Sequence, residues 1–441
     1  MSTIIRGGRL VDPSQKLEHV LDLRIEDGLI AEIGEAIEAR EADIIDARGR
    51  FVAPGFIDMH AHLRDPGLTH KETLRSGLGA AVAGGFTGVA CMPNTSPAID
   101  APAIVADLMA RADALGLARL YPIAAMTIGR RGEELAPYHS LADAGAVAFS
   151  DDGNSVENAR VLRQAALYAR DLAAPFISHC DEPALVADGV MNEGAMSVEM
   201  GLPGVPSIAE DVITARDLII AADTKKSWHI AHVSTQRSLS LIAWARSQDV
   251  HVTSEVTPHH LLLSDDVFSQ WSPFYRVNPP LRGESDRQAL VRAVRDGAID
   301  VFASDHAPHT AAEKSGSFFT SAVGFSGLET AVGAYALALP GLPLLRFVEL
   351  LSTNPARILG IPGGTLRVGS IADITVFTDE QWTVDARALK SKGKNTAFDG
   401  WKFPRRATMT LVGGRVVMYE RRSAIASANL QAAGMAGAIY S

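Results

Sequence analysis

The feature that most constrains the fold is an alternation, from residue 52 to residue 357, between short apolar runs and longer segments of helical periodicity. Short apolar runs are typical of buried strands, and the intervening segments, such as residues 102–116 and 158–173, have the spacing of helices. Eight runs occur, within residues 51–62, 87–93, 119–127, 145–151, 175–180, 227–233, 249–256 and 300–305. Eight strand–helix units predict an α/β fold with a parallel (β/α)8 TIM barrel.

The two ends of the chain have a different pattern. Residues 1–51 and 358–441 contain short alternating strands interrupted by Gly and Asp. Neither end is long enough to form a stable sandwich alone, so we expect both to combine into one small β-sandwich domain beside a catalytic barrel of residues 52–357. The Ala-rich residues 424–441 are expected to form a surface helix or a frayed end.

Charge and composition exclude several functions. A net charge of −10 and a pI near 5.7 argue against binding nucleic acid or an anionic membrane surface, and the pair Arg405 and Arg406 is interpreted as a solvated face. No signal peptide is expected, since the sequence MSTIIRGGRLVD has no basic region followed by an apolar region. No membrane span is expected either, since the apolar stretch at 335–351 is interrupted by prolines, glycine and arginine. Cys91 and Cys180 form no CxxC pattern and are expected to be buried, which favours the cytoplasm.

Polar residues follow the predicted strands at their carboxyl ends. These residues are His60, His62, Asn94, Asp151, Asp152, His179, His232 and Asp305. In a (β/α)8 barrel the carboxyl ends of all strands meet at one rim, where active sites form. We therefore expect these side chains to converge although they are far apart in the sequence.

The spacing of His60 and His62 indicates a metal site. Side chains at i and i+2 of a strand point to the same side, so one metal can bind both rings. Neutral imidazoles with added carboxylates suit Zn²⁺, although ligand type alone leaves Mn²⁺, Co²⁺ and Fe²⁺ open.

A set of motifs carries a family resemblance. In chain order they are DMHAHLRDPG, HKETLRSGLGAAVAGGFTGVACMPNT, FSDDG, ISHCDE, HIAHVST, TPHHL, NPPLR, SDHAPH and GLET. Together they resemble the class I dihydroorotases of bacteria, and the likeness extends across the barrel and into both flanks, including residues 366–377 and 394–401. A single HxH motif would be weak, but this ordered set is specific.

The resemblance implies a centre of two Zn²⁺ ions per chain. Its ligands would be His60, His62 and Asp305 for one ion, His179 and His232 for the other, and Asp152 as a bridge. Asp152 is preferred because its spacing to His179 matches the family pattern, while the sequence leaves Asp151 open. Asp151 is expected to support the loop.

One absence bears on the bridge. No lysine occurs between Lys71 and Lys225. Dihydropyrimidinases and hydantoinases bridge their metals with a carboxylated lysine from around the fourth strand, and that ligand is missing here. An aspartate bridge is the expected substitute.

The resemblance also implies the reaction. It is the reversible cyclisation of N-carbamoyl-L-aspartate to L-dihydroorotate in the synthesis of pyrimidines and UMP. Two metals lower the pKa of a shared water and polarise a carbonyl. Asp305 is expected to act both as ligand and as carrier of the proton that passes to and from the ring nitrogen.

The substrate carboxylate needs its own partners. The positions that match the family's substrate contacts are Arg64, Asn94, Asn278, His309, Val323 and Gly324. The guanidinium of Arg64 suits a carboxylate, with a surface salt bridge as the alternative, and Asn94 could instead be a turn residue. Relatives commonly have PFG where this chain has AVGFS, at residues 322–326, so the shape of that wall differs. His259 and His260 are interpreted as residues that support the site, and His306 as a structural residue.

Other functions compete with this interpretation. Hydantoinases, dihydropyrimidinases and allantoinases share the barrel and metal chemistry, but they use the missing lysine. A non-catalytic dihydroorotase-like subunit could serve as a scaffold for aspartate transcarbamoylase, yet this chain retains every expected ligand. A barrel with a purely structural metal would not explain the carboxylate-binding set. We expect a homo-oligomer, and association with a transcarbamoylase stays open.

Overall fold

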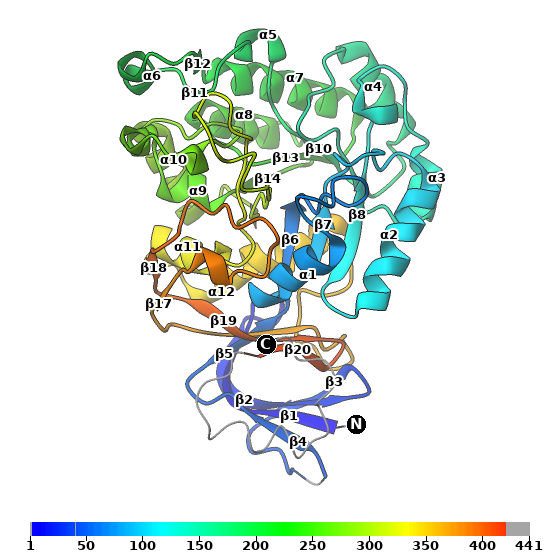
Figure 1. The fold of residues 1–441 in the computed structure, drawn as a ribbon. Helices are drawn as coiled ribbons and strands as arrows, with labels where there is room; N and C mark the ends of the chain where they lie inside the picture. Colours follow the sequence, from blue (N-terminus) through cyan, green and yellow to red (C-terminus); the bar gives the residue numbers. More distant parts are fainter. Residues whose placement is uncertain (1, 40, 420–441) are drawn as a thin grey trace.

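The computed structural model describes residues 2–39 and 41–419 and contains a barrel packed on a curved sheet (Figure 1). The tail predicted at residues 424–441 lies outside the described residues. No helix in the described part of the chain is long and apolar enough to cross a membrane.

The barrel confirms the predicted parallel architecture. Its strands pair in chain order: β6 (Phe56–Ala61), β7 (Phe86–Cys91), β8 (Arg119–Ala124), β9 (Ala148–Phe149), β10 (Phe176–Ser178), β13 (Trp228–Ile230), β14 (Val252–Val256) and β15 (Val301–Phe302). Beyond β15 and β6 the circle is closed by the backbone N–H of His62, which donates to the carbonyl of His306 at 2.7 Å. The carboxyl ends of all eight strands therefore share one rim.

Helices surround the barrel on its outside (Figure 1). The helices between or after barrel strands are α1 (Leu74–Ala83), α2 (Pro102–Leu115), α3 (Tyr138–Asp143), α4 (Ala159–Tyr168), α7 (Ile208–Thr224), α8 (Gln236–Ser247), α10 (Glu284–Arg295) and α11 (Ala331–Ala338). The connecting segments contain shorter elements, which are α5 (Pro183–Val186), β11 (Met191–Asn192), α6 (Ala195–Met200), β12 (Gly204–Val205), α9 (Pro258–Leu262), α12 (Leu344–Val348), α13 (Asn354–Leu359), β17 (Trp382–Thr383) and β18 (Lys402–Phe403).

The barrel interior is a packed apolar core. Met59, Ala90, Ile123 and Val301 come from four different strands and belong to one buried cluster with Ala231, which directly follows β13. Small and medium side chains fill a barrel of this size, so its centre is solid and the chemistry is confined to the rim.

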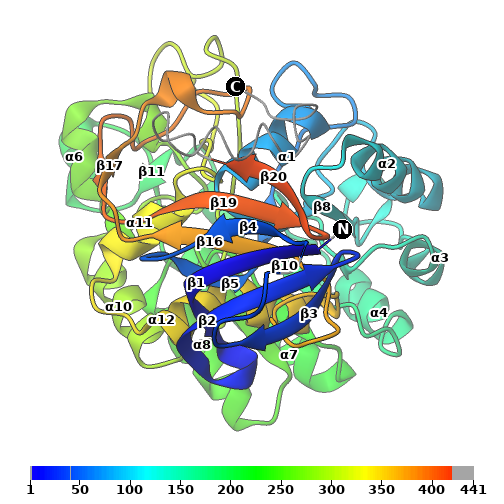
Figure 2. The same cartoon turned by 90° about the horizontal axis from the view of Figure 1, so that it is seen from below.

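The second sheet combines strands from both ends of the chain (Figure 2). Its order is β20-β19-β16-β5-β1-β2-β3, with β4 beside β1. The strands are β1 (Ser2–Asp12), β2 (Leu17–Glu26), β3 (Leu29–Gly34), β4 (Asp43–Asp46), β5 (Phe51–Pro54), β16 (Ile374–Thr378), β19 (Arg406–Val412) and β20 (Arg415–Tyr419). In Figure 1 it curls, with β19 and β20 above β1 to β4, around a buried core that includes Leu10, Leu23 and Ile374. The exact domain boundaries stay a prediction.

Two hairpins of this sheet follow directly from their turn residues. Asp27 and Gly28, between β2 and β3, have φ of 49° and 81°, and Gly413 and Gly414, between β19 and β20, have φ of 55° and 76°. Two consecutive residues with positive φ are what a two-residue hairpin turn needs, and Asp-Gly and Gly-Gly adopt it readily.

The run predicted as one strand at residues 51–62 is divided in the structure. Phe51–Pro54 pairs with β1 and β16 in the curved sheet, whereas Phe56–Ala61 enters the barrel. Gly55 separates them, and a Cβ there would lie 2.0 Å from the Thr87 hydroxyl. The Pro-Gly pair is thus the boundary signal that the continuous apolar pattern concealed.

The curved sheet lies beneath the start of the barrel strands. Thr375 donates its hydroxyl to the carbonyl of Gly85 at 2.6 Å, and Arg119 pairs with Asp373 at 2.6 Å. Gly85 and Arg119 lie where β7 and β8 begin. The opposite rim, formed by the carboxyl ends, is left for the site.

Candidate active site

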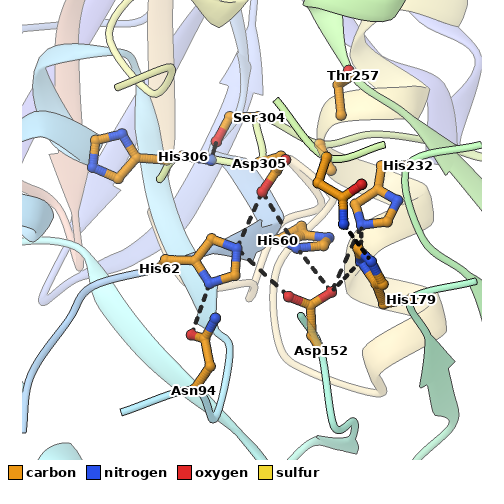
Figure 3. A network of polar contacts seen from close by, with 12 residues as sticks. His60, His62, Asn94, Asp152, His179, His232, Thr257, Ser304, Asp305 and His306 are labelled. Atoms are coloured by element: carbon orange, nitrogen blue, oxygen red, sulfur yellow. Dashed lines mark hydrogen bonds and ion pairs between the residues drawn. The ribbon is translucent and has the colours of Figure 1, made fainter. Parts of the chain in front are cut away.

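The six predicted metal ligands converge at the carboxyl rim of the barrel (Figure 3). His60 lies in β6 and His62 directly after it, and the others follow β9, β10, β13 and β15: Asp152, His179, His232 and Asp305. All six side chains are buried. The prediction from strand-end positions therefore agrees with where the structure places these residues.

His60, His62 and Asp305 form one group. The Oδ1 atom of Asp305 lies 3.1 Å from Nε2 of His62 and 3.5 Å from Nε2 of His60. The pairing of β6 with β7 is irregular between Asp58 and Ala61, on either side of His60. Irregularities of this kind change the direction of a side chain and are common next to active sites.

Asp152 lies between this group and a second one (Figure 3). Its Oδ1 is 3.4 Å from Nε2 of His60, and its Oδ2 is 3.6 Å from Nε2 of His62. On the other side, Oδ1 is 3.7 Å from both Nδ1 of His179 and Nε2 of His232. One carboxylate thus faces all four imidazoles.

The arrangement fits a bound cation. The buried Nε2 of His60 and Oδ1 of Asp152 lack a hydrogen-bond partner among the described residues. Two sets of ligand atoms, from His60, Asp152 and His232 and from His60, His62 and Asp305, each lie within 4.8 Å of one another. Burying a polar atom without a partner costs free energy, and a metal ion bound to these two atoms would supply the missing partner.

The electrostatics also favour positive charge here. Burial alone would raise the pKa of the Asp152 carboxyl, but His60, His179 and His232 hold it well below its ordinary value. Burial likewise opposes a charged His179, yet Asp152 and Asp181 raise the pKa of that imidazole to about 10. An environment that stabilises an imidazolium also stabilises a metal cation.

Three site residues have a left-handed backbone. Arg64, His232 and Asp305 have φ of 60°, 29° and 47°. This region disfavours residues with a Cβ, and such strain concentrates at functional sites.

Asp151 points away from the cluster. It accepts hydrogen bonds from the backbone N–H of Met126 at 2.8 Å and of Thr127 at 3.1 Å, and from the Thr127 hydroxyl. Burial raises the pKa of this carboxyl. Its contacts are those of a residue that joins the loops after β8 and β9.

A cavity of about 430 Å³ opens above the cluster. Its lining includes the six predicted substrate contacts: Arg64, Asn94, Asn278, His309, Val323 and Gly324. Valines at positions 186, 190, 205 and 277 form an apolar wall. The cavity therefore combines polar anchors with apolar surface, as small-molecule sites do.

Arg64 and His309 are neighbours in this cavity. The Nε of Arg64 donates to the Pro308 carbonyl at 3.3 Å, and burial lowers the pKa of its guanidinium to about 10. Burial, with the charge of Arg64 beside it, lowers the pKa of His309 to about 3. His309 is thus neutral near pH 7 and donates from Nε2 to the Val323 carbonyl at 2.7 Å.

The two predicted asparagines contact two of the predicted metal ligands, His62 and His179. The Nδ1–H of His62 donates to Oδ1 of Asn94 at 2.8 Å, which directs Nε2 toward Asp305. The amide nitrogen of Asn278 lies 3.0 Å from Nε2 of His179 and donates to Asp181 at 3.1 Å. Both asparagines therefore orient a ring as well as lining the cavity.

His259, His260 and His306 lie outside the cluster. His260 contacts the Thr257 hydroxyl at 2.7 Å and the Pro279 carbonyl at 3.0 Å. His259 packs on Phe325, with ring centroids 5.0 Å apart. His306 accepts from the backbone of Gly327 at 3.1 Å.

Sequence reasoning missed two carboxylates beside the histidines. Asp181 lies 3.6 Å from Nε2 of His179, and Glu255 lies 2.6 Å from Nδ1 of His60. Asp181 has the same i, i+2 spacing to His179 that marked the first histidine pair. Glu255 is an acidic residue inside a buried strand, which is itself a signal of a paired charge.

Comparison with known proteins gives two matching family models. One, described as Dihydro-orotase-like, matches residues 49–238, and the other, described as Amidohydrolase family, matches residues 217–418. The dihydroorotase of Syntrophus aciditrophicus (strain SB) is 45% identical over 426 residues, covering 95% of this chain and 100% of that protein. The dihydroorotase of Geobacter metallireducens is 46% identical over 427 residues, covering 96% of this chain and 100% of that protein.

Among solved structures, the L-hydantoinase (dihydropyrimidinase) from Arthrobacter aurescens has a TM-score of 0.83 at 24% identity, covering 96% of this chain and 97% of that one. The dihydropyrimidinase from Brevibacillus agri NCHU1002 has a TM-score of 0.79 at 22% identity, covering 95% of each chain. These likenesses establish the shared fold of barrel and terminal sheet.

Proposed function

The chain belongs to the dihydroorotase family of amidohydrolases, and on that premise we propose that its buried cluster binds two Zn²⁺ ions that serve the interconversion of N-carbamoyl-L-aspartate and L-dihydroorotate. The enzyme is a cyclic amidohydrolase. The observation that carries the assignment of the metal centre is the convergence of six buried side chains, among which Asp152 faces all four imidazoles.

The proposed ligand sets follow the two groups. His60, His62 and Asp305 would hold one ion and His179 and His232 the other, with Asp152 shared between the two groups. Support comes from the carboxylate of Asp152. Its Oδ1 lies 3.4–3.7 Å from ring nitrogens of His60, His179 and His232, and its Oδ2 lies 3.6 Å from Nε2 of His62. When bound, the metals supply Lewis acidity that lowers the pKa of water and polarises the ring carbonyl.

The residues of the cavity would hold the substrate. Arg64 is proposed to bind the carboxylate through its guanidinium, with Asn94, Asn278 and the neutral His309 completing the polar contacts. Backbone groups of Val323 and Gly324 would contact the ring. The apolar wall opposite excludes water from the reacting amide.

Asp305 is proposed to carry the proton. Its carboxylate would take a proton from the attacking water and pass it to the departing ring nitrogen, and the reverse order would close the ring. Its Oδ1, 3.1 Å from His62, reaches the centre of the cluster while the residue also lines the cavity.

The assay that tests this proposal offers the purified protein dihydroorotate, dihydrouracil, hydantoin and allantoin in parallel, with elemental analysis of the same sample. We expect turnover of dihydroorotate, with zinc at up to two ions per chain, and little activity on the others. Asp305→Asn serves as the control without a proton carrier. Preferential turnover of hydantoin or dihydrouracil would overturn the substrate assignment, and full turnover of metal-free protein would overturn the mechanism.

Assembly and location stay predictions. We propose a cytoplasmic homo-oligomer, and association with an aspartate transcarbamoylase is tested by co-purification.

A further inference from the structure

We propose that Glu255 is a positioning residue that prepares both halves of the metal centre, by fixing the tautomer of His60 and the backbone of His232. The inference rests on the proposed function, because it concerns the metals assigned above. Glu255 lies in β14, the seventh barrel strand, which supplies none of the six proposed ligands. Its side chain is buried and points to the same rim.

The first contact selects the tautomer of His60. Oε1 of Glu255 lies 2.6 Å from Nδ1 of His60, and both residues have 0% exposure. A carboxylate can only accept, so Nδ1 carries the hydrogen, and a neutral imidazole then keeps the lone pair on Nε2. That Nε2 is the atom that faces Asp152 and has no hydrogen-bond partner among the described residues.

The second contact holds the other half of the centre. The same Oε1 accepts the backbone N–H of His232 at 3.2 Å. His232 has a φ of 29°, which its backbone would not adopt without support. A single oxygen atom thus contacts a proposed ligand of each metal.

A third group keeps the carboxylate from rotating. Oε2 of Glu255 lies 3.1 Å from Nε2 of His229, and Nδ1 of His229 lies 2.8 Å from the Thr253 hydroxyl. His229 is also fully buried. Because Oε2 is occupied by His229, Oε1 remains directed at His60 and His232.

The test compares Glu255→Gln with Glu210→Gln. Glu210 is a matched control, because it is equally buried but accepts from the backbone N–H of Ser234 at 3.0 Å and of Thr235 at 3.2 Å, with no imidazole among its described contacts. Zinc affinity is measured by competition with a chromophoric chelator, and the Co²⁺-substituted proteins are compared by absorption spectroscopy. Denaturant midpoints of the metal-free proteins report stability separately.

We expect Glu255→Gln to weaken zinc binding about ten- to a hundredfold and to change the Co²⁺ spectrum. Glu210→Gln should lower stability and keep wild-type zinc affinity. Wild-type zinc affinity and an unchanged Co²⁺ spectrum in Glu255→Gln would overturn the inference. If that variant does not fold, Glu255→Asp replaces it. Its shorter side chain keeps the charge but withdraws the carboxylate from Nδ1 of His60. Unchanged zinc affinity in Glu255→Asp would equally overturn the inference.

The wild type separates this inference from the proposed function. If wild-type protein binds no zinc or does not turn over dihydroorotate, the proposed function fails. If the wild type does both while Glu255→Gln binds zinc like the wild type, only the role of Glu255 is refuted.

Discussion

The guanidinium of Arg64 is buried beside the cluster, donates to the Pro308 carbonyl and lies 3.4 Å from Nε2 of His309. None of its hydrogen bonds goes to one of the six proposed metal ligands. Arg64→Met should therefore spare metal content and weaken substrate binding. Loss of a charge-assisted contact costs about 1.5–3 kcal/mol, or roughly ten- to a hundredfold in kcat/KM. Steady-state kinetics with metal analysis checks this, and unchanged kinetics would assign Arg64 a structural role.

The neighbouring aspartates should respond in opposite ways to substitution. Asp152→Ala removes the anion that faces four imidazoles, so two cations would face each other without it and at least one site should empty. Asp151→Ala breaks hydrogen bonds to residues 126 and 127, so it should lower stability while metal binding persists. Metal analysis of both variants checks the pair.

The same pair tests the bridge itself. Preparations made with and without added bicarbonate should be equally active, because an aspartate bridge needs no carbon dioxide. A requirement for bicarbonate, or metal loss in Asp151→Ala alone, would contradict the assignment.

Most of the residues at the rim could be predicted from the sequence, because the carboxyl ends of all strands in a parallel barrel meet at the same rim. Their partners could not. Glu255 meets His60 across 195 positions of the chain, and Asn94 meets His62 across 32. Such pairings depend on strand register and on the irregular pairing of β6 with β7 between Asp58 and Ala61. Neither feature leaves a periodic signal in the sequence.

At the scale of elements, two rim loops approach each other very closely at Gly67. A Cβ there would lie 1.7 Å from the Ser96 carbonyl oxygen, and its φ is 83°. Gly67→Ala should force apart the loops that carry Arg64 and Asn94, lowering both stability and kcat/KM. Gly49, with a φ of 74° and nothing within 4 Å, is the matched control. Gly49→Ala should cost only the left-handed strain of about 1–2 kcal/mol and leave kcat/KM unchanged.

Urea unfolding and kinetics of the two glycine variants separate strain from steric overlap. Equal stability losses in Gly67→Ala and Gly49→Ala, with normal kcat/KM in both, would show that the two loops yield without disturbing the site.

Glu329 joins the segment around residue 390 to the barrel. Its carboxylate accepts the backbone N–H groups of Lys390 at 2.8 Å and Ser391 at 3.0 Å, and burial raises its pKa to about 7. Because the folded pKa lies above the unfolded value of 4.5, the buried carboxyl is neutral at low pH, and its contribution to stability is fully present below pH 4.5. That contribution is lost as the pH rises through 7, because the buried group must then ionise. Between pH 5.5 and pH 8 the loss is at most about 2 kcal/mol.

Glu329→Gln keeps an acceptor oxygen and does not titrate. Its free energy of unfolding should therefore fall less than that of the wild type between pH 5.5 and pH 8, as measured by urea denaturation. Parallel pH profiles for the two proteins would contradict the shifted pKa.

The order and type of the barrel elements could be predicted from periodicity, as could the pairing of both flanks into one β-domain. The division at Gly55 could not be placed from periodicity, because apolar side chains continue on both sides of the Pro54–Gly55 pair, and the tertiary contacts assign residues 51–54 and 56–61 to different sheets. The short β11 and β12 were also missed, because two-residue strands are below the length at which alternation is visible.

At the scale of the whole molecule, the proposed metal centre would join strands one, four, five, six and eight of the barrel. Ions that bind the folded chain and not the unfolded chain stabilise it by mass action, by about 2.7 kcal/mol for each site at a hundredfold excess over Kd. Treatment with a strong chelator should abolish activity and lower the denaturant midpoint, and added Zn²⁺ should restore both. Identical midpoints with and without chelator would mean that the proposed centre does not hold the fold together.

The curved sheet also has a consequence for synthesis on the ribosome. β5 ends at Pro54 and pairs with β16, which begins at Ile374, so its partner is translated 320 residues later. At about 5–20 residues per second the wait is roughly 16 to 64 s. During that time the edge of β5 that later pairs with β16 exposes unpaired backbone N–H and C=O groups while the barrel forms. A chaperone that bound this nascent intermediate would keep the edge from pairing with other chains.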